Sequence, residues 1–136
     1  MMLFYRVVID PNILISYCIS ARLHELPALI EKYNLEFCAN ETLVTEFANV
    51  IARERIKKYL LKEPVYYIET IRRFVSLYDT QIYFKGSPDI NDDYLIDIVQ
   101  QTNAAELVTG DKALLNWQNP PVQIISWKNF QLTYTL

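Results

Sequence analysis

The fold is decided by a stretch near the start of the chain, Phe4-Tyr5-Arg6-Val7-Val8-Ile9-Asp10-Pro11. Its β-branched and aromatic residues predict a short buried strand that ends at Asp10. Pro11 suits the first turn of a following helix, because the N–H that proline lacks has no intrahelical partner there. The stretch therefore predicts a strand that runs directly into a helix, with an aspartate at the junction.

The same alternation continues along the chain. Further short strands are predicted at residues 35–38, 106–109 and 122–126, with a weaker one at 82–84. Apolar residues at helical spacing predict helices at 13–18, 24–33, 43–51 with an extension towards 61, 64–75, 91–102 and after 126. Strands that alternate with helices indicate an α/β fold, a three-layer α/β/α sandwich around a parallel sheet of four or five strands. We expect a single domain over residues 1–136, because no low-complexity linker or repeat divides the chain.

Composition excludes several classes of protein. No apolar run approaches the ~20 residues that span a bilayer, and the apolar start is too short for a signal peptide. We therefore expect a cytoplasmic protein without a membrane partner. Cys18 and Cys38 lack CxxC spacing, so we interpret them as reduced, buried thiols. With His24 as the one histidine, the sequence argues against a zinc site.

Charge is unevenly distributed in this sequence. Residues 53–73 hold seven basic side chains against three glutamates, a net +4, which leaves −7 elsewhere in a chain of net charge −3. A basic surface beside an acidic remainder fits a protein that holds a phosphate backbone, although an ordinary solvated helix with ion pairs explains it equally well. The candidate RNA contacts are Arg53, Arg55, Lys57 and Lys58.

Two of the predicted strands run into aspartates, Asp10 and Asp111. In parallel sheets ligands bind beyond the carboxyl ends of the strands, so adjacent strands would place both carboxylates at one edge. On a helical wheel, Glu46 falls at the rim of the apolar face of its helix. Four more carboxylates crowd the start of the helix at 91–102: Asp89, Asp92, Asp93 and Asp97. Such mutually repelling oxygen donors suit Mg²⁺ or Mn²⁺, which would make an attacking water more acidic.

At this point the motifs resemble those of the PIN-domain family, within it the branch of toxin ribonucleases of toxin–antitoxin systems (VapC-like). Residues 8–12 are similar to the family's first-strand motif, hydrophobic residues followed by Asp-x-Asn, and Glu46 stands where the family has its helical glutamate. Residues 87–95 are similar to its acidic run, and residues 107–115, with Thr-Gly-Asp-Lys, to its most recognisable stretch. The chain departs from the family where Pro11 replaces a usual threonine and Asp97 a small apolar residue.

The resemblance implies a Mg²⁺- or Mn²⁺-dependent endoribonuclease with Asp10, Glu46, Asp93 and Asp111 as catalytic metal ligands. Asn12 and Thr109 would orient ligands or substrate. Asp92 is a further candidate: a straight helical wheel favours it, whereas the family's spacing to Asp111 favours Asp93. The resemblance also implies a small antitoxin partner and a homodimer.

Two other interpretations fit the residues. Aspartates at strand ends with a nearby lysine also describe receiver domains and aspartate-nucleophile phosphatases. However, Lys112 directly follows Asp111, and Asn12 stands where those phosphatases have a second aspartate. Alternatively, a catalytically weak PIN-like fold would serve as a protein- or RNA-interaction module, an interpretation that Pro11 keeps open.

Overall fold

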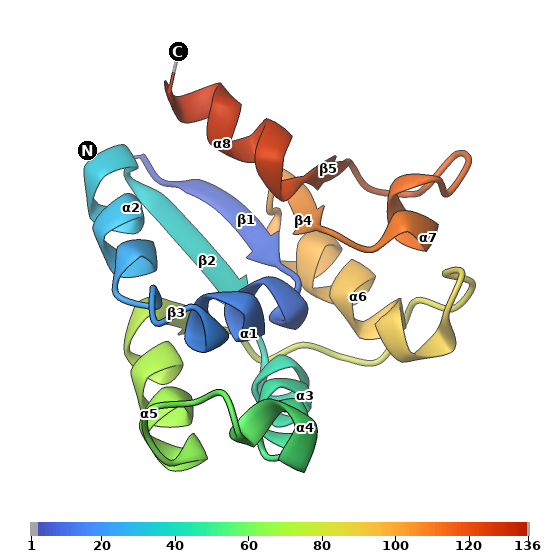
Figure 1. Cartoon of the computed structure of the whole chain (residues 1–136). Helices are drawn as coiled ribbons and strands as arrows, with labels where there is room; N and C mark the ends of the chain where they lie inside the picture. Colours follow the sequence, from blue (N-terminus) through green and yellow to red (C-terminus); the bar gives the residue numbers. More distant parts are fainter. Residues whose placement is uncertain (1–2, 136) are drawn as a thin grey trace.

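The computed structural model describes residues 3–135, which form an α/β sandwich (Figure 1). The elements follow in this order: β1 (Tyr5–Ile9), α1 (Pro11–Ile19), α2 (Glu25–Tyr33), β2 (Leu35–Ala39), α3 (Glu41–Ile51), α4 (Glu54–Lys57), α5 (Pro64–Phe74), β3 (Val75–Leu77), the 3₁₀ turn η1 (Ile90–Asp92), α6 (Asp93–Thr102), β4 (Glu106–Thr109), α7 (Lys112–Leu115), β5 (Ile124–Ser126) and α8 (Trp127–Thr135). This arrangement confirms the predicted fold class.

The five strands form one parallel sheet in the order β3-β2-β1-β4-β5. Because crossovers between parallel strands are right-handed, α1, α2 and α5 cover one face of the sheet, and α6 covers the other, against β1, β2 and β4. From β1 the chain adds β2 and β3 on one side of the sheet and then β4 and β5 on the other. The strand order therefore reverses between β1 and β4, which are neighbours with Ile9 beside Val108. The carboxyl end of a sheet at such a reversal is where α/β proteins bind ligands.

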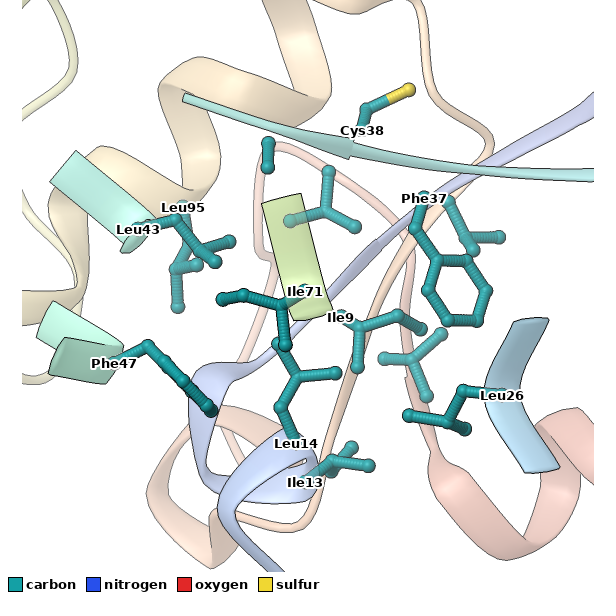
Figure 2. Close-up of a cluster of buried hydrophobic side chains, with 14 of the residues drawn as sticks. Ile9, Ile13, Leu14, Leu26, Phe37, Cys38, Leu43, Phe47, Ile71 and Leu95 are labelled. Atoms are coloured by element: carbon teal, nitrogen blue, oxygen red, sulfur yellow. The ribbon is translucent and has the colours of Figure 1, made fainter. Parts of the chain in front are cut away.

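The core lies between these layers and is built from the strands and the inner faces of the helices. Figure 2 shows Ile9 and Phe37 of the sheet with Leu14 of α1, Phe47 of α3 and Leu95 of α6, all buried. Because residues from every layer contribute to this core, the loops at the carboxyl edge are fixed by rigid elements. Cys18 and Cys38 are buried free thiols, as predicted.

Three of the strands are followed by residues that cap a helix. The side chains of Asp10, Asn40 and Asp111 each accept a backbone N–H in the first turn of α1, α3 and α7, respectively. Side-chain oxygens at this position satisfy N–H groups that the helix leaves unpaired. Two of the three caps are the aspartates that the sequence singled out.

The third strand of the sheet is not where the sequence predicted it. Residues 82–84 are not a strand. The edge strand β3 begins instead at Val75, which the sequence pattern places at the end of the helix predicted at 64–75. Val75 serves as the C-cap of α5 and also pairs with Phe37 of β2. Pairing along the sheet thus overrides the local helical pattern at this point.

The helix at 43–51 does not continue towards Leu61. It ends at Ile51, and Arg53 has an extended backbone before the short α4 begins. The apolar spacing that holds α3 against the core stops at this point, because residues 52–55 read Ala-Arg-Glu-Arg. No helix within residues 3–135 is long and apolar enough to cross a membrane.

Candidate active site

Asp10 lies at the carboxyl end of β1, where its side chain is almost fully buried, at 4% exposure. One carboxylate oxygen accepts the backbone N–H of Asn12 at 3.0 Å, and the other accepts the hydroxyl of Thr109 at 2.7 Å. The donor of this capping bond is Asn12, so the bond does not need the N–H that Pro11 lacks. Proline in place of the family's threonine therefore leaves it intact. Burial raises the pKa of Asp10, the two hydrogen bonds lower it, and the charge of Asp111 raises it further.

Asp111 is brought beside Asp10 by the pairing of β1 with β4. The hydroxyl of Thr109 links the two, because it donates to Asp10 and accepts the backbone N–H of Asp111 at 3.0 Å. One carboxylate oxygen of Asp111 accepts the N–H of Ala113 at 2.8 Å. The fully buried Thr109 therefore contacts both acidic residues through its hydroxyl.

Asp92 and Glu46 complete a cluster with these two aspartates. Burial raises the pKa of Asp92 to about 7, and the charges of Asp10, Asp89, Asp111 and Glu46 add to the effect. Glu46 reaches this group from the exposed side of α3. Four elements that are distant in sequence thus direct negative charge to one place at the edge of the sheet.

Tyr94 also belongs to this cluster. Burial raises the pKa of its hydroxyl, and so do the charges of Asp10, Glu46 and Asp92. The phenol therefore stays neutral and available as a hydrogen-bond donor among the carboxylates. No sequence pattern sets Tyr94 apart from the other nine tyrosines of the chain.

Asp93 has a different environment from Asp92. Its carboxylate accepts two hydrogen bonds from Ser87, one from the backbone N–H at 2.9 Å and one from the hydroxyl. Of the two adjacent aspartates, Asp92 is the one whose pKa the charges of Asp10, Asp111 and Glu46 raise, whereas Asp93 is bound to Ser87 in the loop before η1. The geometry thus differs from the family spacing that favoured Asp93.

Asp97 and Gln101 continue the line of Asp93 along one face of α6. Asp97 is buried and accepts the backbone N–H groups of Tyr83 and Phe84 at 3.1 and 2.8 Å. The side-chain amide of Gln101 accepts the backbone N–H of Gln81 and donates to the backbone carbonyl of the same residue, each at 2.8 Å. Residues four apart on a helix share a face, so these three side chains bind the 81–87 segment alongside α6. We call Asp93, Asp97 and Gln101 the α6 ladder.

The predicted RNA contacts lie beyond the helix that carries Glu46. Arg53, Arg55, Lys57 and Lys58 are all exposed. Lys57 forms a long ion pair with Glu63, 3.8 Å apart. Since α3 rises about 1.5 Å per residue, its end at Ile51 lies about 8 Å beyond Glu46 along the helix, and Arg53 follows two residues later. The basic stretch is therefore within reach of a polymer that passes the cluster.

The donor chemistry of the cluster fits a hydrated divalent cation. Within residues 3–135, none of the four carboxylates forms an ion pair with a lysine or arginine. Burial and the neighbouring negative charges raise the pKa of Asp92, and no basic side chain in the described residues offsets them. No three histidine, cysteine or carboxylate side chains in this described part of the chain form a ready-made metal cage. Mg²⁺ needs none, because it keeps several waters and uses one or two carboxylates.

Comparisons with known proteins identify the family of this chain and support its fold. A family model described as PIN domain matches residues 6–113. The structure is similar to a chain in the crystal structure of VapBC2 from Rickettsia felis bound to a DNA fragment from their promoter, with a TM-score of 0.60 and 13% sequence identity over 90% of this chain and 98% of that chain. At that identity the likeness concerns the fold, and no curated protein matches the chain. The family match spans most of the sequence, so the chain belongs to the PIN-domain family, as its motifs predicted.

Proposed function

We propose that this protein is a Mg²⁺- or Mn²⁺-dependent endoribonuclease. The observation that carries the proposal is the pair Asp10 and Asp111, which Thr109 joins at the ends of β1 and β4. The charges of both, and of Glu46, act on Asp92, and none of the four has a basic partner in the described residues. Membership of the PIN-domain family supports the same reaction class. When bound, the cation would offset the negative charge of the RNA phosphate and would make an attacking water more acidic.

In this proposal the residues of the site have separate roles. Asp10 and Asp111 hold the cation from the ends of two neighbouring strands, and Thr109 is a positioning residue that fixes them through its hydroxyl. Asp92 supplies the third carboxylate in place of Asp93, because Asp92 faces the other acidic groups. Glu46 adds negative charge from the exposed side. Asn12 is exposed at the first turn of α1, where its amide can contact substrate.

Arg53, Arg55, Lys57 and Lys58 lie just beyond α3, the helix that carries Glu46, and support a nucleic-acid substrate. We propose RNA because the motifs resemble those of toxin ribonucleases. Phosphate contacts supply most of the affinity of proteins for nucleic acid. The cluster itself is acidic and binds RNA only when a cation offsets its charge. Binding near the cluster should therefore depend on the cation, whereas binding to the basic residues should depend on salt.

The proposal is tested with purified protein and an end-labelled RNA of about 30 nucleotides. We expect cleavage in Mn²⁺ or Mg²⁺ and none in EDTA, and we expect Asp10→Asn or Asp111→Asn to abolish it. Mn²⁺ should also raise the Tm of the parent by several degrees, since a ligand of the native state stabilises it by mass action. Neither variant should show that rise. Cleavage by both variants at the parental rate would overturn the site assignment.

We further propose that the nuclease is the toxin of a toxin–antitoxin pair. One solved structure with a similar fold is named as VapBC2 bound to a DNA fragment from their promoter. This chain also exposes large apolar side chains beside lysines around α4 and α5, at Tyr59, Leu61, Val65 and Tyr66. The test is co-purification with the product of a neighbouring short reading frame and loss of RNA cleavage in that complex.

The proposed free form is a homodimer. Light scattering at several protein concentrations would measure its mass against that of the 16.0 kDa chain. A constant monomeric mass with full RNA cleavage would overturn the dimer and leave the nuclease proposal in place.

A further inference from the structure

A cavity of about 640 Å³ opens beside the carboxylate cluster, between α1 and α8. Asn12, Gly110 and Asp111 form its near wall, so the cavity and the proposed active site share a boundary. It extends along α1 as far as Ser20 and Arg22. The rise of α1 from Asn12 to Ser20 is about 12 Å, which leaves room for a planar ring system next to the cluster.

The floor of this cavity is aromatic and rigid. Trp127 is half-buried at the start of α8, and its ring meets that of Tyr17 edge to face, with centroids 5.7 Å apart. The indole N–H donates to the Tyr17 hydroxyl at 3.0 Å, which satisfies the indole and fixes the two rings relative to each other. Phe130 stacks behind the indole at 5.6 Å. A fixed aromatic surface of this kind is what single-stranded nucleic acid uses for base stacking.

The rim of the cavity is polar and lacks acidic side chains apart from Asp111. Ser16 and Ser20 line it from the exposed side of α1, and Gln131 lines it from α8. Hydroxyl and amide groups both donate and accept hydrogen bonds, so they can meet the edge of a base. They offer no charge that would hold an ion. This lining suits a neutral planar group with hydrogen-bonding edges.

Arg22 is the cation at the far end of the cavity. Glu25 holds its guanidinium through Nε and Nη2 at 2.8 and 2.9 Å, and the group lies 5.2 Å from the centre of the Tyr17 ring. These contacts fix its plane and leave Nη1 outside the pair with Glu25. A guanidinium in a fixed orientation is suited to a phosphate. The cavity thus has the carboxylate cluster at one end and a guanidinium at the other.

We propose that this cavity binds the base of the nucleotide next to the cleaved phosphodiester, with Trp127 as its stacking wall and Arg22 contacting the following phosphate. The inference rests on the proposed function for its substrate class, and it assigns that substrate a single-stranded form, because a paired base cannot enter. Ser16 and Gln131 then determine which base is preferred.

The experiment follows the fluorescence of Trp127 while RNA binds. Trp117→Phe leaves Trp127 as the single tryptophan, and Ca²⁺ replaces Mn²⁺ so that binding is measured without turnover. The probes are the hexamers rA6, rC6 and rU6, and a hexamer of the same backbone without bases. We expect at least one of the three homopolymers to quench Trp127 and the abasic hexamer to leave its emission unchanged.

Filling the cavity provides the matched comparison. Ser16→Phe should weaken binding of the preferred homopolymer on the order of tenfold, the lower part of the range for one lost base stack. It should not alter binding of the abasic hexamer. Asn129→Phe adds the same ring to the exposed side of α8, outside the cavity, and should behave like the parent. Gln131→Ala, which removes rather than adds bulk, should shift the preference among the three bases.

The outcomes separate this inference from the nuclease proposal. Cleavage of RNA in Mn²⁺ with equal binding by the parent and Ser16→Phe would overturn the cavity alone. Base-dependent quenching of Trp127 with no cleavage in any divalent cation would overturn the nuclease and leave a nucleotide site. Quenching by the antitoxin, with no response to any homopolymer, would overturn the cavity proposal in favour of a protein occupant.

Discussion

Asp92 and Asp93 are adjacent in sequence but have opposite surroundings. Burial raises the pKa of Asp92, and the charges of Asp10, Asp89, Asp111 and Glu46 raise it further, to about 7. Asp93 faces away and is satisfied by the N–H and hydroxyl of Ser87. The cluster and the α6 ladder therefore use the same residue type, at the end of η1 and at the start of α6, for different purposes.

The difference lies in what each carboxylate meets. In the ladder, backbone N–H groups stabilise the charge of Asp97, and hydrogen bonds to charged groups contribute about 1.5–3 kcal/mol each. In the cluster, the neighbours are themselves negative, so the charges destabilise the metal-free protein. An acidic residue that lowers stability unless a cation is present is a better candidate for function than one with a full set of donors.

The largest expected effect compares the two neighbours directly. Asp92→Asn should lower RNA cleavage by more than about 100-fold, above the usual range for the partners of metal ligands. Asp93→Asn should leave cleavage within a few-fold of the parent, because an amide oxygen still accepts from Ser87. Initial rates at saturating Mn²⁺ measure both. The reverse ranking would restore the assignment that the family spacing favoured.

The second effect concerns the stability that the ladder contributes. Asp97→Ala removes the acceptor of two backbone N–H groups and a buried side chain, so the free energy of unfolding should fall by about 2–4 kcal/mol. Urea denaturation measures the loss. Gln101→Ala, at an exposed position on the same face, should cost about 1 kcal/mol. If Asp97→Ala stabilises the protein instead, Asp97 belongs with the repelling carboxylates of the cluster.

How far the sequence predicts the site can be judged from these residues. The adjacency of Asp10 and Asp111 was predictable, because parallel strands end at one edge of the sheet and both motifs follow confident strands. The choice between Asp92 and Asp93 was not. The 3₁₀ turn η1 ends at Asp92, and such a turn has about 3.0 residues per turn instead of 3.6. Neither a regular wheel nor a linear spacing therefore fixes which side chain faces the cluster.

The errors in the fold have a related cause. Ile82-Tyr83-Phe84 has the composition of a strand, but side chains of α6 satisfy its N–H groups where a neighbouring strand would otherwise do so. The short strand at Val75–Leu77 follows α5 without a turn, so no punctuating residue marks it. Both depend on tertiary partners, which a local pattern does not contain.

A smaller effect is expected on the pH dependence of the metal-free protein. The folded-state pKa of Asp92 lies above its unfolded value, so the unfolded state releases the proton first and stability falls as pH rises from about 4 to 7. Solvent screening of this half-buried group reduces the loss to on the order of 1 kcal/mol. Thermal unfolding in EDTA measures it, and Asp92→Asn should flatten the profile. A parental Tm that climbs over this interval would contradict the repulsion within the cluster.

The smallest effect should come from the basic residues, which act on RNA outside the comparison of carboxylates. Lys57→Ala with Lys58→Ala should weaken RNA binding a few-fold and reduce the slope of log K against log salt by about 1.4, since each single-strand phosphate contact contributes about 0.7. Lys32→Ala with Lys128→Ala removes the same charge from α2 and α8 and should leave the slope unchanged. Equal slopes in the two double variants would mean that RNA binding responds to the net charge of the protein and not to the position of Lys57 and Lys58. In that case only the carboxylate cluster, with its cation, would position the RNA.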